Sequence, residues 1–369
     1  MISKENLKNL PAVLSCFLIS IFLLVPFHSF SEEESNPADS ATRETAAGEE
    51  SEGEFKPADM IAHHITDDYQ FHITGHLYFP LPVILYSKTD GLAVFLSNKF
   101  KGPNHTYAPY KGYIYEHRDG AHIIREDGGK FFNLSLTKNA FSMMLTVVLM
   151  LVLFIPIAGA YKKREGQAPK GLQSFFEIVI VFVRDQVVKP SIGEKKYQKY
   201  LPYMLTLFFF IWMNNMLGLI PIFPGSANVT GNIAVTFTLA ALSLLMINIS
   251  GNKHYWGHLF WPPGVPVLVK PILIPIELVG IISKPFALMI RLFANMTAGH
   301  IVLLSIMSLI FVFAPKIGVA GSLGVGVAAV AFTIFMYLIK LFVAALQAYI
   351  FTLLTSLFIG QAVEEPAHH

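Results

Sequence analysis

Ionisable side chains within long apolar stretches are the residues of this chain most able to do chemistry. Arg291 is the clearest case, because it lies in the middle of the apolar stretch 281–310. A charged arginine near a bilayer midplane costs about 2.5–3.5 kcal/mol on insertion scales, and a guanidinium cannot escape that cost by losing its proton. We therefore expect Arg291 to meet water or an acidic partner inside a membrane.

The other polar residues of the last two apolar stretches are few. They are Glu277, Ser283, Lys284, Asn295, Thr297, His300, Lys340 and Gln347. On a helix with 3.6 residues per turn, Arg291 and Asn295 share a face, and Glu277 lies about four turns away within roughly 40° of that face. His300 points to nearly the opposite side of the helix.

These groups differ in whether they can carry a proton. Glu277 and His300 can each relay a proton through a water-filled half-cavity, whereas Arg291 stays charged, repels protons between the two halves and attracts a carboxylate. The pattern therefore predicts a proton path in two halves. Two simpler roles remain open: Glu277 could be hydrated at a helix end, and His300 could be hydrogen-bonded within the bundle.

Lys340 and Gln347 are seven residues apart and therefore share a helix face. Lys340 could extend its amine to the membrane surface, or it could titrate within the membrane. Gln347, like Asn295, could do no more than form a hydrogen bond between helices.

The composition is that of a membrane protein. Hydrophobic residues make up 53% of the chain and charged residues 14%, against about 25% charged in soluble domains. The net charge of +2 and the lack of an extended basic tract argue against nucleic acid as a partner.

Neither a metal nor a cofactor is expected. The one cysteine, Cys16, excludes an intrachain disulfide and a multi-cysteine metal site. Seven histidines lie between residues 58 and 138, at spacings that match no ordinary metal-ligand pattern. They are His63, His64, His72, His76, His105, His117 and His122.

Three segments precede the membrane part. Residues 1–30 have the pattern of a secretory signal, a basic start followed by an apolar run, with an uncleaved membrane anchor as the alternative. Residues 31–57 are acidic and are expected to form a disordered linker. Residues 58–139 are expected to form a small periplasmic domain with β character, because short strand-like runs flank hairpin turns at Asp90-Gly91 and Asp119-Gly120.

Residues 140–369 form the predicted membrane domain. Three apolar runs in it are long enough to cross a hydrocarbon core of about 30 Å, namely 141–161, 201–223 and 232–249. The connection 162–199 has nine basic and four acidic residues, which marks it as cytoplasmic. Its apolar part, 172–188, is expected to lie along the interface.

The last two apolar stretches, 271–313 and 322–358, are too long for vertical spans. As straight helices they would measure about 65 and 55 Å, so we expect a steeply tilted hairpin whose inner face can wrap a cylindrical partner. The predicted fold class is all-α and polytopic, with about five transmembrane helices, one interfacial helix and a small β-containing N-terminal extramembrane domain. The topology places the mature N-terminus outside and the C-terminus inside.

Several motifs resemble one family. The segments LVGIISKPFALMIRLFANMTAGH and LQAYIFTLLTSLFIGQAVEE are similar to subunit a, the membrane stator subunit of F-type ATP synthases. MNNMLGLIP resembles the second membrane helix of that family, with Asn215 at the position of the family's asparagine, and IAHHITD resembles the segment before its first span. The resemblance covers residues 59–66 and 141–365.

The resemblance implies a non-catalytic proton-channel subunit of the bacterial inner membrane. In this family, the arginine matching Arg291 faces the essential carboxylate of a rotating ring of small subunits, and two half-channels serve that carboxylate. Glu277 matches the family's cytoplasmic-side glutamate. The periplasmic-side polar positions are matched by Asn295, His300, Lys340 and Gln347, and the supporting polar positions are Asn215, Ser283 and Lys284. The implied partners are the rotor ring, the peripheral-stalk subunit b, the rest of the ATP synthase complex and membrane lipids.

Two features depart from the family pattern. The position of His300 is a glutamate in some relatives, with a histidine then at the position of Lys340, so a lysine there leaves the chemistry of the access channel open. The region 31–138 is also much longer than in compact relatives.

Functions of other classes fit the sequence less well. A secondary transporter could use Arg291 to hold an anionic substrate, but transporters often have two related halves, and the sequence has no such repeat. An intramembrane hydrolase would need a nucleophile–base pair in the spans, and a voltage sensor would need repeated arginines; neither is present. The carboxylate that selects the coupling ion would lie in the ring, and His300 and Lys340 favour protons.

Overall fold

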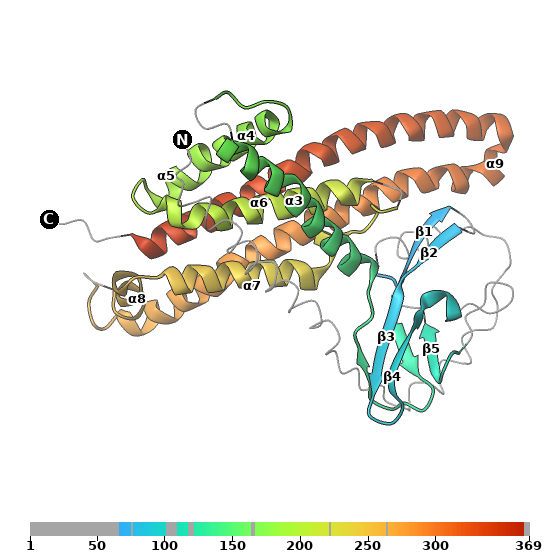
Figure 1. The fold of residues 1–369 in the computed structure, drawn as a ribbon, viewed down its shortest axis with the longest axis horizontal. Helices are drawn as coiled ribbons and strands as arrows, with labels where there is room; N and C mark the ends of the chain where they lie inside the picture. Colours follow the sequence, from blue (N-terminus) through green and yellow to red (C-terminus); the bar gives the residue numbers. More distant parts are fainter. Residues whose placement is uncertain are drawn as a thin grey trace.

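The computed structural model describes residues 66–74, 77–100, 109–116, 122–163, 167–220, 223–262 and 265–364. The expected signal segment 1–30, the acidic linker 31–57 and five of the seven histidines named above lie outside these residues. The described chain forms two parts, a small β domain and a helical body, joined where the β domain meets the start of the first long helix (Figure 1).

Within the described residues, the β domain has seven short strands in three antiparallel sheets, β1–β2, β4–β3–β7 and β5–β6. Their bounds, with those of one 3₁₀ turn, are β1 (Gln70–Thr74), β2 (Leu77–Pro80), β3 (Pro82–Ser87), β4 (Gly91–Leu96), η3 (Ser97–Phe100), β5 (Tyr113–Glu116), β6 (His122–Arg125) and β7 (Phe132–Asn133). The turn expected before Gly91 joins β3 to β4, and Gly91 adopts a φ of 74° there. The turn expected at Asp119-Gly120 lies outside the described residues, although β5 and β6 on either side of it pair antiparallel.

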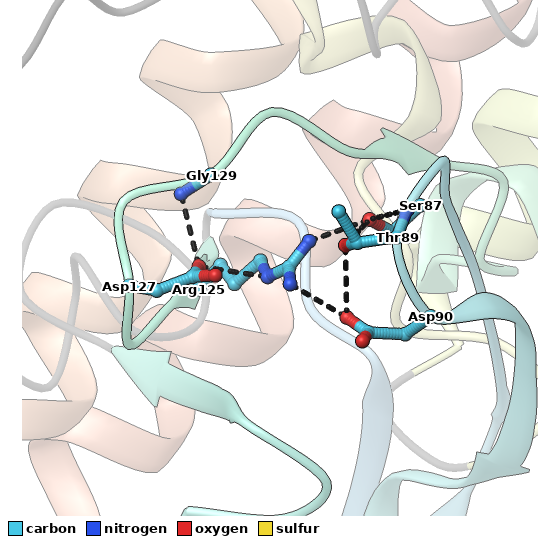
Figure 2. A network of polar contacts seen from close by, with 6 residues as sticks. All are labelled: Ser87, Thr89, Asp90, Arg125, Asp127 and Gly129. Carbon is cyan, nitrogen blue, oxygen red and sulfur yellow. Dashed lines mark hydrogen bonds and ion pairs between the residues drawn. The ribbon is translucent and has the colours of Figure 1, made fainter.

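Arg125 fastens this β3–β4 turn to the end of β6 (Figure 2). Its Nη2 lies 2.6 Å from Asp90 Oδ2, its Nε lies 2.7 Å from Asp127 Oδ1, and its Nη1 donates to Ser87 Oγ. The arginine side chain is only 10% exposed. Two carboxylates therefore compensate its charge and a hydroxyl accepts a third bond within the domain, so its role is structural.

Five helical segments of the described chain are long and apolar enough to cross a membrane. They are Lys138–Tyr161, Tyr197–Leu219, Ile233–Ser250, Lys270–Leu309 and Leu323–Val363. The helices that contain them are α3 (Lys138–Lys163), α6 (Tyr197–Leu219), α7 (Ile233–Ser250) and α9 (Lys270–Val363). The structure thus confirms a polytopic helical membrane protein with a small strand-containing N-terminal part.

Helix α9 is the hairpin predicted from the two over-long apolar stretches. It doubles back in Figure 1, and its two apolar arms have 40 and 41 residues, about 60 Å each at 1.5 Å per residue. The helix continues through Pro275 and Pro285, so neither proline interrupts the first arm. In α6, 72% of the most apolar window is buried, against 17% in each arm of α9. Helix α6 is therefore the core of the helical body, and α9 presents a large exposed surface.

Short helical segments gather at the end of the helical body opposite the β domain (Figure 1). They are α4 (Leu172–Phe182), the π-helical turn η5 (Val183–Val188), α5 (Lys189–Ile192) and α8 (Lys253–Phe260), while the 3₁₀ turn η6 (Val229–Gly231) precedes α7. Arg184 makes two bonds to Asp185, of 2.7 and 2.8 Å, and these hold the pKa of Asp185 below its usual range. The segment expected at the interface, 172–188, is thus helical throughout.

Candidate functional site

Arg291 lies on the exposed side of the first arm of α9. Leu288, Leu292 and Met296, at helical spacing, are at most 4% exposed and point into the helical body, which turns Arg291 outward. In the part of the chain that the structure describes, no hydrogen bond or ion pair is recorded for the Arg291 side chain. Its guanidinium is therefore available to a group outside this chain.

The surface around Arg291 is largely apolar. The large apolar side chains exposed just before it on the first arm are Phe286 and Ile290. Lys284, two turns before Arg291 on nearly the same side of the helix, is exposed as well. On the second arm, Leu338 and Phe342 are 62% and 67% exposed. A largely apolar surface of this kind in a membrane protein faces lipid or another subunit, and the charge of Arg291 lies within it.

Asn295 and Gln347 join the two arms one turn beyond Arg291. The amide of Asn295 donates to Gln347 Oε1 over 2.7 Å, and Gln347 is only 2% exposed. Asn215 of α6 donates to the carbonyl of Ala344, 3.3 Å away, on the second arm and accepts a hydrogen bond from Thr230. The predicted polar positions 215, 295 and 347 therefore hold α6 and both arms of α9 in register.

His300 and Lys340 form a second group, toward the hairpin turn. His300 Nδ1 lies 2.9 Å from the carbonyl of Met296, and its Nε2 lies 3.3 Å from the carbonyl of Gly218 on α6. Since a neutral imidazole has a single N–H, only the protonated ring can donate to both carbonyls. Lys340 is 8% exposed and packs over Gly299, where an added Cβ would lie 2.9 Å from Lys340 Cε.

Glu277 belongs to a third group, near the start of α9. Its side chain is 28% exposed, and its Oε1 lies 3.8 Å from Nδ1 of His258 on α8. Lys284 donates to Gln361 Oε1 over 3.2 Å, which ties the beginning of α9 to its end. Ser283 bonds only to the carbonyl of Gly280 in its own helix, so the structure gives it a local role.

Arg291 and the Asn295–Gln347 pair thus lie between two outlying groups, His300 with Lys340 toward the hairpin turn and Glu277 with His258 near the start of α9. Sequence reasoning missed His258, whose only signal was its place in a histidine-containing segment four residues after His254. It also gave no role to Asn214, which accepts a hydrogen bond from Thr146 of α3 over 3.0 Å. Among the described residues, no group of three or more His, Cys, Asp or Glu could hold a metal ion.

Comparisons with known proteins match both parts of the chain. A family model described as ATP synthase A chain matches residues 140–360, and one described as a domain of unknown function matches residues 60–141. ATP synthase subunit a of Chloroherpeton thalassium is 42% identical over 66% of this chain and 70% of its own length. ATP synthase subunit a 2 of Chlorobaculum tepidum is 37% identical over 88% and 79%, and subunit a of Pelodictyon phaeoclathratiforme is 36% identical over 95% and 94%. The family match over residues 140–360 and these relatives show that the chain belongs to the ATP synthase A chain family.

Proposed function

We propose that this chain is the proton-translocating stator subunit of a rotary ATP synthase. It provides two aqueous half-channels to a carboxylate on the rotor ring and couples proton flow to ring rotation and ATP synthesis. Arg291 carries the proposal: it is an exposed charge on an apolar face of α9 with no recorded partner among the described residues. The relatives support it, since each is described as an ATP synthase subunit a.

The two outlying groups supply the two half-channels. His300, with Lys340 beside it and the Asn295–Gln347 pair nearby, serves the periplasmic half-channel. Glu277, with His258 beside it, serves the cytoplasmic half-channel. A proton from the first half-channel neutralises a ring carboxylate, which lets that carboxylate leave Arg291 and turn through the lipid. After a full circuit, the carboxylic acid loses its proton to the second half-channel and returns to Arg291 as a carboxylate.

Arg291 separates the two half-channels in this scheme. A guanidinium does not release its proton, so it cannot relay protons from one side to the other. Its charge also holds the deprotonated ring carboxylate in the low-dielectric membrane, where an unpaired carboxylate is costly. The ring therefore turns only when protonation releases one carboxylate and deprotonation supplies the next.

The orientation follows from charge. The β domain and the group of α4, α5 and α8 lie at opposite ends of the helical body (Figure 1). The basic connection 162–199 contains α4 and α5, so we place that end in the cytoplasm with the C-terminus, and the β domain in the periplasm. Residues 1–30 are proposed to be a cleaved signal peptide, 31–57 a linker, 58–139 the periplasmic domain and 140–369 the membrane domain.

The chain acts within a complex and has no catalytic activity of its own. The rotor ring covers the exposed face of α9, and the peripheral-stalk subunit b, the remaining ATP synthase subunits and the membrane lipids are its other partners. The synthesis of ATP takes place elsewhere in the complex.

Replacing Arg291 tests the proposal. In membrane vesicles that contain the whole complex, Arg291→Ala is expected to abolish ATP synthesis driven by a proton gradient, since nothing then separates the half-channels or holds the ring carboxylate. Ile290→Ala, at the neighbouring exposed position, is the matched control and should retain synthesis. Normal proton-driven synthesis in the Arg291→Ala vesicles would rule the proposal out. If the chain purifies without a rotor ring or soluble ATPase, an independent transporter becomes the better explanation.

A further inference from the structure

Helix α3 has a buried polar face that takes no part in the two half-channels proposed above. Its members, Lys138, Asn139, Ser142 and Thr146, are 7%, 3%, 0% and 0% exposed. Residues 138, 142 and 146 recur every four positions and therefore lie on one side of the helix. The opposite side is apolar and exposed at Met144, Val148, Val152 and Ile155. We call the four buried residues the α3 polar face.

The outer end of this face is the junction with the β domain. Asp67 Oδ1 accepts a hydrogen bond from the backbone N–H of Asn139 over 2.9 Å. Lys138 Nζ donates to the carbonyl of Thr66 over 3.0 Å, and the Lys138 N–H donates to the carbonyl of Asp68 over 2.7 Å. Thr66 and Asp67 are half-buried, whereas Lys138 is buried. The junction therefore links the α3 polar face to half-buried residues of the β domain.

Asp67 is suited to take up a proton. Burial raises the pKa of Asp67, although the Asn139 N–H and the charge of Lys138 act in the opposite direction. The other titratable groups that the structure describes around it are Asp68 and Tyr69, and burial raises the pKa of Tyr69 to about 12, which keeps that phenol neutral. Asp67 thus holds its proton at a higher pH than an exposed aspartate does.

The inner end of the α3 polar face leads toward His300. Thr146 Oγ1 donates to Asn214 Oδ1 over 3.0 Å, and Gly218, whose carbonyl lies 3.3 Å from His300 Nε2, is one turn beyond Asn214 on the same side of α6. The Thr146–Asn214 bond and the helix spacing therefore lead from the α3 polar face through α6 to His300.

Several buried polar atoms along this route have no hydrogen-bond partner in the described chain. They are Asn139 Oδ1, Ser142 Oγ, and both Nδ2 and Oδ1 of Asn228, which precedes η6. Helices α3, α6, α7 and α9 all contact η6, so Asn228 lies where these elements meet. A buried polar group without a partner destabilises the fold, and in native proteins such groups normally bind protein atoms or water. A polar route of this kind is therefore expected to be hydrated.

We propose that the junction of the β domain with α3 is the outer entrance of the proton path, where Asp67 takes up the proton and water along the α3 polar face conducts it to His300. The inference rests on the proposed function and gives part of the β domain a role in it. The Asp67 carboxylate accepts a proton from hydronium in the external water, then releases it to water beside α3 and is regenerated. The competing explanation is that the same groups only fasten the β domain to the helical body.

The first test asks whether water reaches the α3 polar face. Its outcome does not depend on the role of Arg291. In the whole complex with Cys16→Ser, we compare Ser142→Cys with Val148→Cys, which lies on the exposed apolar side at 54% exposure. Silver ion added from outside is expected to react about tenfold faster at position 142, because only a thiolate in water is reactive, and to stop proton-driven ATP synthesis. Equal protection of both thiols would overturn the inference, and so would reaction at position 142 without loss of synthesis.

The second test separates proton uptake from fastening. Asp67→Asn keeps the oxygen that accepts from Asn139 but cannot carry a proton, Asp67→Glu keeps the carboxyl, and Glu126→Gln is the control at an exposed acid of the same domain. At constant driving force, Asp67→Asn is expected to slow ATP synthesis increasingly as the outer side is made alkaline, while the other two variants stay near normal. The role of Asp67 would be overturned if Asp67→Asn synthesised ATP at a normal rate at every outer pH. It would also be overturned if synthesis fell equally at every pH, in proportion to the amount of assembled complex. If Arg291→Ala keeps ATP synthesis intact while the thiol at position 142 reacts with silver, the proposed function is wrong but the hydrated path along α3 is supported.

Discussion

At the scale of single residues, the chain places fixed and exchangeable charges in different settings. Arg291 is exposed and without a recorded partner in the described residues, whereas Lys340 is buried and His300 lies between two carbonyl groups. Asn295 and Gln347 carry no charge, yet they connect the two arms between these groups. The neutral pair therefore fixes the two arms to each other between these charged groups.

The Asn295–Gln347 bond gives a prediction at this scale. A double-mutant cycle with Asn295→Ala and Gln347→Ala, measured as the thermal stability of the purified complex, is expected to show a coupling of about 0.6 kcal/mol and at most about 1.7, the range found for hydrogen bonds between membrane helices. Thr297 and Gln347, which share no recorded hydrogen bond, form the control cycle and should behave additively. Additive losses for Asn295 and Gln347 would mean that their contact does not hold the arms together.

At the scale of elements, the two arms of α9 are held at their ends and along their length. Near one end, Lys284 donates a hydrogen bond to Gln361, and the C-terminal end of the second arm packs on α5. That packing depends on Gly360: a Cβ there would lie only 1.9 Å from the backbone oxygen of Ser191. Backbone cannot move aside as a flexible side chain can, so glycine is required at this crossing.

Gly360→Ala is therefore expected to destabilise the complex by about 1–3 kcal/mol, the usual cost of overpacking. Gly324→Ala is the matched control, because a Cβ at Gly324 meets nothing within 4 Å and alanine favours a helix by up to about 1 kcal/mol. The thermal midpoint of the two variants should move in opposite directions. A stable Gly360→Ala complex would show that α5 and α9 are not in close contact.

Some elements could be predicted from the sequence, and others could not. The hairpin was predictable because 43 and 37 apolar residues cannot cross a membrane vertically as straight helices. The π-helical turn Val183–Val188 has no local sequence signal of comparable strength. The contact of Glu277 with His258 joins residues 19 positions apart on different helices, and the contact of Thr146 with Asn214 spans 68 residues, so neither follows from helix periodicity.

At the scale of the whole molecule, an aromatic cluster joins the β domain to the helical body. Phe71 and Phe79 of the β domain lie 5.3 and 4.8 Å, between ring centroids, from Phe223 in the loop before α7, and Phe71 lies 5.5 Å from Phe141 of α3. Aromatic pairs at such distances contribute about 0.5–1.5 kcal/mol each beyond the burial of their area. The cluster therefore fixes the orientation of the β domain on the helices.

Phe223→Ala is expected to loosen this joint without unfolding either part. The measurement is the rate at which an added protease cuts the chain between the β domain and α3 in intact vesicles, and this rate should rise. Phe237→Ala, at a 61% exposed position on α7, is the control and should not change it. An unchanged cutting rate in Phe223→Ala would show that the hydrogen bonds of Asp67 and Lys138 alone hold the joint.

The exposed position of Arg291 also has a consequence for biogenesis. Before a ring docks, its guanidinium lies in an apolar face toward lipid, at a cost of about 2.5–3.5 kcal/mol. In the function proposed above, a docked ring carboxylate relieves that cost, so Arg291 would also favour assembly of the complex. The orphan chain is the less stable species, and membrane quality-control proteases should degrade it sooner than the assembled one.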